Sequence, residues 1–130
     1  MALQKLNQDE EIHLTFTVSQ ILENWELDDN IQLSLLGLED KIKPRHLYKY
    51  RNGDISFDFD QNLITRSTMI LGIHESLGTT YPSNRDYGAI WLKRPVKKFK
   101  HKTPLELMLS GETGMRRVWY FLDCTQTWQD

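Results

Sequence analysis

The chain has 130 residues, a net charge of −2, 39% hydrophobic residues and one cysteine. This length fits one compact domain, or two small units that share a core. A single cysteine excludes an internal disulfide and a cysteine-rich zinc cluster. The lack of disulfides is typical of proteins in a reducing cytoplasm. The sequence contains neither a run of the ~20 apolar residues that span a membrane nor a signal-peptide pattern. We therefore expect a cytoplasmic protein that does not enter a membrane.

The two halves of the chain differ in charge. Residues 1–60 contain 12 acidic and six basic residues, whereas residues 61–130 contain six acidic and ten basic residues. Affinity for nucleic acid comes largely from neutralisation of phosphates, so the acidic first half is a poor non-specific binder. Any binding to DNA must therefore be local, or must come from a dimer.

The beginning of the chain predicts a flexible arm followed by a helix. Residues 1–13 are polar and without periodicity, which indicates the arm. Thr17 and Gln20 have the spacing of a capping box and start the helix. Its apolar residues recur at helical spacing up to Trp25 and predict one buried stripe.

Two further helices follow. The second begins near Asp28, whose charge suits a helix N-terminus, and ends at Gly37. The third begins at Pro44 and runs to Arg51. Such a pair resembles a helix-turn-helix, but six residues separate the two helices, whereas the usual turn has about 3–4 residues. We therefore expect a degenerate or lengthened motif.

The third helix carries the candidate DNA-binding side chains. Basic and aromatic groups of this kind contact phosphates and base edges. An equally good interpretation is a solvated face with Leu47 and Tyr50 in the core. The candidates are Arg45, His46, Tyr48, Lys49 and Arg51.

The middle of the chain predicts a central helix. Residues 55–59 alternate apolar and polar residues, and we interpret them as an extended linker whose neighbour Asp60 caps the next helix. That helix runs from Gln61 to Leu77 with a broad apolar face, and Gly78 ends it. Ser83 is expected to cap a fifth helix, which ends before Pro95.

A basic loop occupies residues 93–102, where six lysine and arginine residues surround Phe99. One interpretation is a solvated loop without a binding function. The other is a surface that contacts phosphate or a partner protein, because lysines around an apolar ring can both steer and anchor a partner. The sequence leaves these alternatives open.

The end of the chain predicts two helices. Thr103, Pro104 and Glu106 combine an N-cap, a first-turn proline and a capping-box glutamate, and Gly111 ends this short helix. The last helix buries one stripe of apolar residues. The buried stripe consists of Met115, Val118, Trp119 and Leu122, and the outward side chains are Arg116, Arg117, Tyr120 and Asp123.

The predicted fold is all-α, with six to seven short helices and no internal repeat. The four histidines share no metal-binding spacing, and the chain has no glycine-rich phosphate loop. His74 is the best isolated functional candidate, but we expect it to be a partly buried, hydrogen-bonded structural residue. We therefore expect no catalytic residues, no metal and no cofactor.

The second half resembles the toxin-binding module of bacterial antitoxins of the Xre/MbcA/ParS family. The matching features occur in the same order along the chain, and they are strongest from Arg66 onward. They are Ile70-Leu71-Gly72-Ile73-His74, Ala89-Ile90-Trp91-Leu92, Pro95, Phe99, Thr103 to Met108, and Gly114 to Leu122. After the arm (1–13), the resemblance implies an Xre-like helix-turn-helix region (14–60) and a toxin-binding domain (61–130).

The resemblance also implies a function. Such a protein binds a RES-domain toxin that depletes NAD, and its C-terminal segment obstructs the NAD pocket of the toxin. The implied contacts are Arg116, Arg117, Tyr120, Asp123 and Trp128, with Lys98 and Lys100 of the basic loop as neighbours. Relatives commonly form homodimers and repress their own operon. The alternative is a stand-alone transcription regulator that binds operator DNA through its third helix.

Overall fold

The computed structural model describes residues 6–80 and 87–128, and for residues 125–128 only the course of the helix. These residues form six α-helices and two 3-10 helices. Strand-like pairing in the described ranges is limited to one bridge, between Val96 and Lys102. The predicted all-α fold is therefore confirmed. None of the helices in these ranges is long and apolar enough to cross a membrane.

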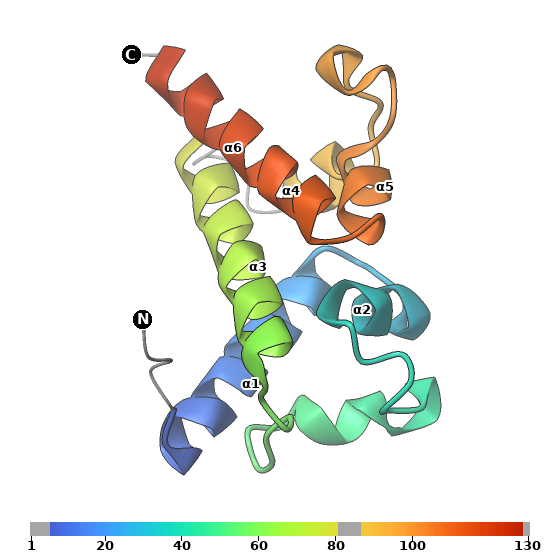
Figure 1. Cartoon of the computed structure of the whole chain (residues 1–130), viewed down its shortest axis with the longest axis vertical. Coiled ribbons are helices and arrows are strands. Elements are labelled where there is room, and N and C mark those ends of the chain that lie inside the picture. The colour runs from blue at the N-terminus through green and yellow to red at the C-terminus, as the bar shows by residue number, and fades with distance from the viewer. Residues whose placement is uncertain (1–5, 81–86, 129–130) are drawn as a thin grey trace.

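Helix α3 (Gln61–Thr80) is the central element of the fold. It packs against α1 (Gln8–Asn24), α2 (Asp29–Leu36), α4 (Tyr87–Trp91) and α6 (Glu112–Trp128). Figure 1 shows α1 near one end of α3 and α6 lying along the other end. A single apolar cluster extends from Val18 to Leu122 and joins both halves of the chain. The two predicted units therefore share one core.

Helix α1 begins earlier than the sequence analysis predicted. The side chain of Asn7 accepts a hydrogen bond from the backbone N–H of Glu10 at 2.8 Å, and the backbone N–H of Asn7 donates to the Glu10 carboxylate at 3.0 Å. This reciprocal capping box satisfies donors that the first turn leaves free. The predicted arm is therefore wrong for residues 8–13, which are helical, and Thr17 lies inside the helix. Residues 1–5 lie outside the described part of the chain.

Helix α2 has the boundaries that the sequence predicted. The Asp28 carboxylate accepts from the N–H of Ile31 at 2.8 Å. Gly37 ends the helix in the left-handed conformation, with φ of 73°. A Cβ atom there would also lie 2.9 Å from the side-chain nitrogen of Asn62, but this exposed side chain can move, so the positive φ is the reason that the position needs glycine.

The predicted third helix is a 3-10 helix, η1 (Pro44–Tyr50). It begins at Pro44, as predicted. Leu47 is the one residue of this helix that is fully buried. Histidine and tyrosine are weak α-helix formers, and a short segment gains little from packing one side chain. The second helix of the expected helix-turn-helix is therefore tighter and shorter than an α-helical recognition helix.

Helix α3 starts as predicted but ends later. The Asp60 carboxylate caps it by accepting from the N–H of Leu63 at 2.8 Å. The helix continues through Gly78 to Thr80, because one helical glycine costs only about 1 kcal/mol relative to alanine. The predicted stop at Gly78 is therefore wrong. Ser83, the expected cap of the next helix, lies outside the described residues.

The last two helices pack closely. Helix α5 (Pro104–Leu109) has the predicted capping box, with Thr103 and Glu106 bonded reciprocally at 2.9 and 3.0 Å. A Cβ atom on Gly114 would overlap the carbonyl oxygen of Leu107. Glycine at this position therefore allows α6 to approach α5.

Candidate protein-binding site

The outer face of α6 presents large polar and aromatic side chains to solvent. Arg116, Arg117, Tyr120 and Asp123 are all exposed, as the helical spacing predicted. Tyr120 is 71% exposed, which is the largest fraction among the exposed large hydrophobic side chains in the described ranges. The Met115 and Val118 side chains on the opposite face are fully buried. Helix α6 therefore holds an exposed Arg/Tyr surface on a firmly packed base.

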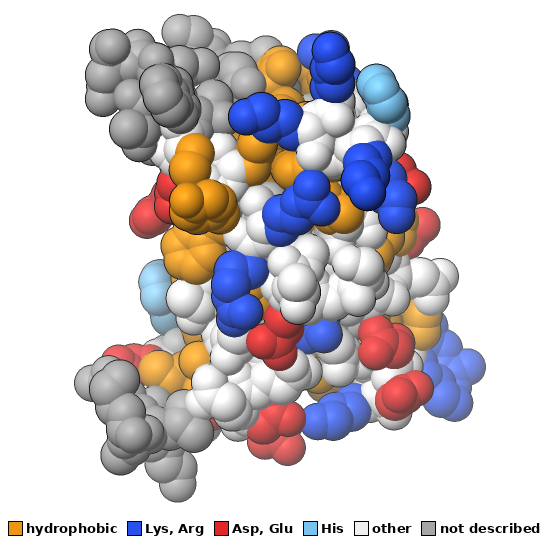
Figure 2. Space-filling view, turned by 45° about the horizontal axis from the view of Figure 1, so that its top comes forward, with side chains coloured by type: hydrophobic (Ala, Val, Ile, Leu, Met, Phe, Trp, Pro, Cys, Tyr) orange, Lys and Arg blue, Asp and Glu red, His pale blue; other side chains and the backbone are white. Residues whose placement is uncertain are grey.

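Trp119 lies between the exposed and buried faces of α6. A Cβ atom on Gly72 of α3 would overlap the Trp119 indole ring, so this glycine makes room for the ring. Two shallow hollows, with volumes of about 290 and 180 Å³, share Trp119 and Asp123 in their walls. Tyr120 and Arg116 complete the smaller hollow. Figure 2 shows hydrophobic side chains gathered beside lysine and arginine side chains on this face.

Asp123 connects the outer face of α6 to α3. Its carboxylate accepts a hydrogen bond from the Ser76 hydroxyl at 2.8 Å. The sequence analysis identified Asp123 but missed Ser76, since the two residues are 47 positions apart and no local pattern links them. The bond fixes the direction of an exposed carboxylate on this surface.

Tyr120 also has a polar neighbour on its own helix. A hydrogen bond with the thiol of Cys124 raises the pKa of Tyr120 above 10.0. The hydrogen bond with Cys124 therefore favours the neutral phenol on this surface.

Arg117 links α6 to the basic loop. Its guanidinium donates to the carbonyl oxygen of Lys98 at 3.1 Å and lies 5.3 Å from the centre of the Phe99 ring. The Lys98 and Lys100 side chains are exposed. The structure therefore brings the predicted residues of α6 and of the basic loop together. Trp128 is the last residue of α6, and its side chain lies outside the described part.

The predicted DNA-binding residues do not form one uniform surface. Arg45, His46, Tyr48 and Lys49 are exposed on η1. The pKa of His46 is lowered, first by the charge of Lys49 and then by weak burial and by the charges of Arg45 and Lys43. These residues therefore form a locally positive segment.

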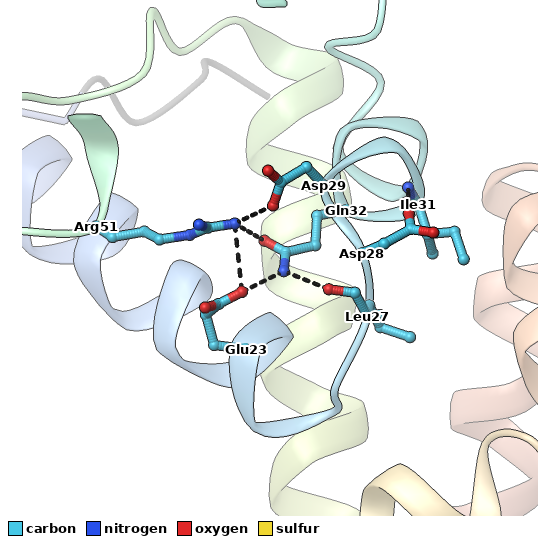
Figure 3. Close-up of polar contacts among 7 residues, drawn as sticks. All are labelled: Glu23, Leu27, Asp28, Asp29, Ile31, Gln32 and Arg51. Atoms are coloured by element: carbon cyan, nitrogen blue, oxygen red, sulfur yellow. Dashed lines mark hydrogen bonds and ion pairs between the residues drawn. The ribbon is translucent and has the colours of Figure 1, made fainter. Parts of the chain in front are cut away.

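Arg51 differs from these four residues because it is bound to the interior of the molecule. Its guanidinium lies 2.6 Å from the Asp29 carboxylate and 3.2 Å from the Glu23 carboxylate. Gln32 accepts from it at 3.3 Å, and the same Gln32 donates to Glu23 and to the carbonyl oxygen of Leu27. Figure 3 shows these groups converging between α1, α2 and the end of η1. The structure thus places Arg51 in a structural network and leaves the other four side chains exposed.

His74 does not have the environment that the sequence analysis predicted. Its side chain is exposed on α3 instead of partly buried, because the apolar face of the helix is formed by neighbours such as Ile70, Ile73 and Leu77. No group of three or more metal-ligating side chains occurs within the described ranges.

A comparison with models of protein families finds a match in the second half of the chain. Residues 76–124 match the model of the antitoxin Xre/MbcA/ParS C-terminal toxin-binding domain. The matched segment includes the α6 surface up to Asp123 and the whole basic loop. Comparison with curated proteins gives no match.

The fold is also found in a solved structure. It matches a chain of the crystal structure of the M. tuberculosis MbcT–MbcA toxin–antitoxin complex with a TM-score of 0.57 and 22% identity. The match covers 88% of this chain and 94% of the other. At this identity the likeness shows a common fold. The predicted recognition is confirmed in that residues 76–124 match the C-terminal toxin-binding domain of the Xre/MbcA/ParS antitoxins.

Proposed function

We propose that this protein is the antitoxin of a toxin–antitoxin pair and neutralises its toxin by binding it. The observation that carries the proposal is the position of Arg116 and Tyr120. They are exposed side by side on α6, within the segment that matches the toxin-binding domain. Arginine and tyrosine are enriched among the residues that dominate binding energy, and a rigid helix loses little entropy on binding.

We further propose that the toxin is a RES-domain protein that consumes NAD, and that the C-terminal segment of this chain covers its NAD pocket. The segment that would do so starts at Arg116 and continues through Tyr120 and Asp123 to Trp128. An interface of about 800 Å² per partner is typical of stable complexes. The outer face of α6 and the adjacent basic loop would both contribute to such an interface.

The first half has a separate role in this proposal. Residues 14–60 would form an Xre-like unit that represses the operon as part of a homodimer, and residues 61–130 would bind the toxin. The exposed groups Arg45, His46, Tyr48 and Lys49 support a DNA contact through their positive charge. Arg51 is not part of this contact, because two carboxylates already hold it.

Co-expression with the toxin-like product of the neighbouring gene tests the proposal. We expect a stable complex and restored growth with the native chain. The double variant R116A/Y120A should weaken the complex by at least tenfold, as two hot-spot truncations of about 1–2 kcal/mol each would do. Tyr48→Ala is the matched control, since this tyrosine is also exposed, at 59%, but lies on η1.

The opposite outcome would favour a stand-alone transcription regulator. In that case no complex forms and growth is not restored, while the purified chain binds operator DNA. Loss of that DNA binding in R45A/K49A, with full binding in R116A/Y120A, would establish the regulator in place of the antitoxin.

A further inference from the structure

The basic loop, residues 93–102, contains six lysine and arginine residues and no acidic residue. Figure 1 shows this segment, between α4 and α5, projecting from the helical body. A solvated loop without a binding function needs no defined conformation. A defined conformation therefore supports the interpretation in which the loop contacts a partner.

The backbone of the loop is closed by several hydrogen bonds. The N–H of Val96 donates to the carbonyl oxygen of Lys102, and the N–H of His101 donates to that of Val96, both at 3.0 Å. Between them, Lys100 and His101 have positive φ angles of 56° and 66°. Residues other than glycine adopt this conformation at a cost, and such residues are concentrated at binding and active sites.

The loop is also anchored from within by Phe99. This ring is only 2% exposed and lies 5.0 Å from the ring of Phe121 on α6. The Arg117 guanidinium covers Phe99 and binds the carbonyl oxygen of Lys98. The tip of the loop is thus held on α6, which carries the proposed toxin-binding residues.

The positive charges of the loop fall into two groups. Lys93 donates to the carbonyl oxygen of Glu26 at 3.0 Å, and Arg94 donates to the hydroxyl of Tyr87 at 3.4 Å, so these two contact the helical body. The remaining four lysines have exposed side chains on the closed part of the loop. They are Lys97, Lys98, Lys100 and Lys102.

We infer that the basic loop is a preorganised docking element for an acidic surface on the protein that α6 binds. This inference rests on the proposed function and adds the chemistry of the partner. Fixed charges beside an interface raise the rate of association by steering the encounter, and they contribute less to the lifetime of the complex. The loop thus steers the partner, and α6 holds it.

A nucleic acid is the less suitable partner for this surface. Proteins that bind single strands stack bases on exposed aromatic rings. The aromatic ring of the loop, Phe99, is buried, and Arg117 covers it. The surface therefore offers lysine charges on a fixed backbone but no exposed aromatic ring for base stacking, and such charges suit carboxylates distributed over a protein surface.

The test compares two triple variants with the same change in charge. K97Q/K98Q/K100Q neutralises the loop, whereas K43Q/R45Q/K49Q neutralises exposed residues of the first half. Association and dissociation rates with the purified toxin are measured from low to high salt concentration. We expect the loop variant to associate about tenfold more slowly at low salt, with less than a threefold change in dissociation. The difference should disappear at high salt, where charges are screened.

Three results would contradict the inference. If both triples slow association equally, only net charge matters and the loop has no special role. If the loop triple leaves toxin association unchanged but abolishes binding to labelled DNA or RNA strands, the surface binds nucleic acid. If the native chain forms no complex with the toxin, the proposed function fails and this inference fails with it.

Discussion

Basic residues in the two halves of this chain have different local environments. In the first half, Arg51 is held by Glu23 and Asp29 and joins three elements. In the second half, the lysines of the basic loop remain exposed, and aromatic packing around Phe99 fixes the backbone. A basic residue therefore indicates a binding surface only where no carboxylate of the same chain pairs with it.

The two halves also differ in how their helices are held together. The first half relies on a polar network between α1, α2 and η1, whereas the second relies on close helix approaches at Gly72 and Gly114. Both packing modes join the same apolar core. The first two variants below each perturb one of these packing modes, and the other two perturb a helix cap and the attachment of the basic loop. They are ordered from the largest expected effect to the smallest.

Gly72→Ala should have the largest effect, because the added methyl group would overlap the Trp119 ring. We expect a loss of about 2–3 kcal/mol in the free energy of unfolding, as in other overpacked sites. Chemical denaturation monitored by tryptophan fluorescence measures this loss. Gly78→Ala on the same helix is the control: no described atom lies within 4 Å, and it should stabilise by up to about 1 kcal/mol. Equal effects would mean that α3 and α6 do not depend on this approach.

Arg51→Ala should destabilise the first half by about 1–2 kcal/mol. It leaves Asp29, Glu23 and Gln32 without their shared cationic partner, and the two carboxylates are only partly exposed to water whereas Gln32 is buried. Arg45→Ala removes the same type of side chain from an exposed position and should change stability by less than about 0.5 kcal/mol. Denaturant titration of both variants measures the difference. If the two variants have the same stability, the network is not a source of stability.

Asp60→Ala should cost about 1 kcal/mol, because it removes the N-cap of α3. The hydrogen bond from the Leu63 N–H, opposed by weak desolvation and aided by Lys41, lowers the pKa of Asp60 below 3.8. A lowered pKa means that this contribution is present above the unfolded value and is lost as the pH falls through the folded value. Asp60→Asn retains a cap and should show a weaker dependence on pH in thermal melts between pH 2 and about 6. A dependence identical to that of the native chain would show that Asp60 does not titrate as expected.

Arg117→Ala should have the smallest effect on global stability, about 0.5–1 kcal/mol, which is typical of an exposed cation–π contact. Its local effect should be larger, because the basic loop loses its attachment to α6. Hydrogen exchange of the backbone amides of residues 96–102 should accelerate. Arg116→Ala is the control, since this side chain is 65% exposed and its contact with Glu112 is long, at 4.0 Å. Unchanged exchange in R117A would contradict the preorganisation of the loop.

The sequence by itself determined the features that depend on neighbouring residues. The caps at Asp28, Asp60 and Thr103 and the helix end at Gly37 were correctly predicted, because each involves groups within a few positions. The start of α1 was also present in the sequence as the Asn7–Glu10 pair but was overlooked in favour of Thr17.

Only the tertiary structure decided which of the candidate side chains are accessible. Arg51 meets Asp29 across 22 positions, Arg117 meets Lys98 across 19, and Asp123 meets Ser76 across 47. Such contacts depend on the packing of helices, which no local spacing encodes. The sequence therefore determined the helix caps named above and the resemblance of the second half to the antitoxin toxin-binding domain, and the packing decided which charged side chains are exposed to a partner.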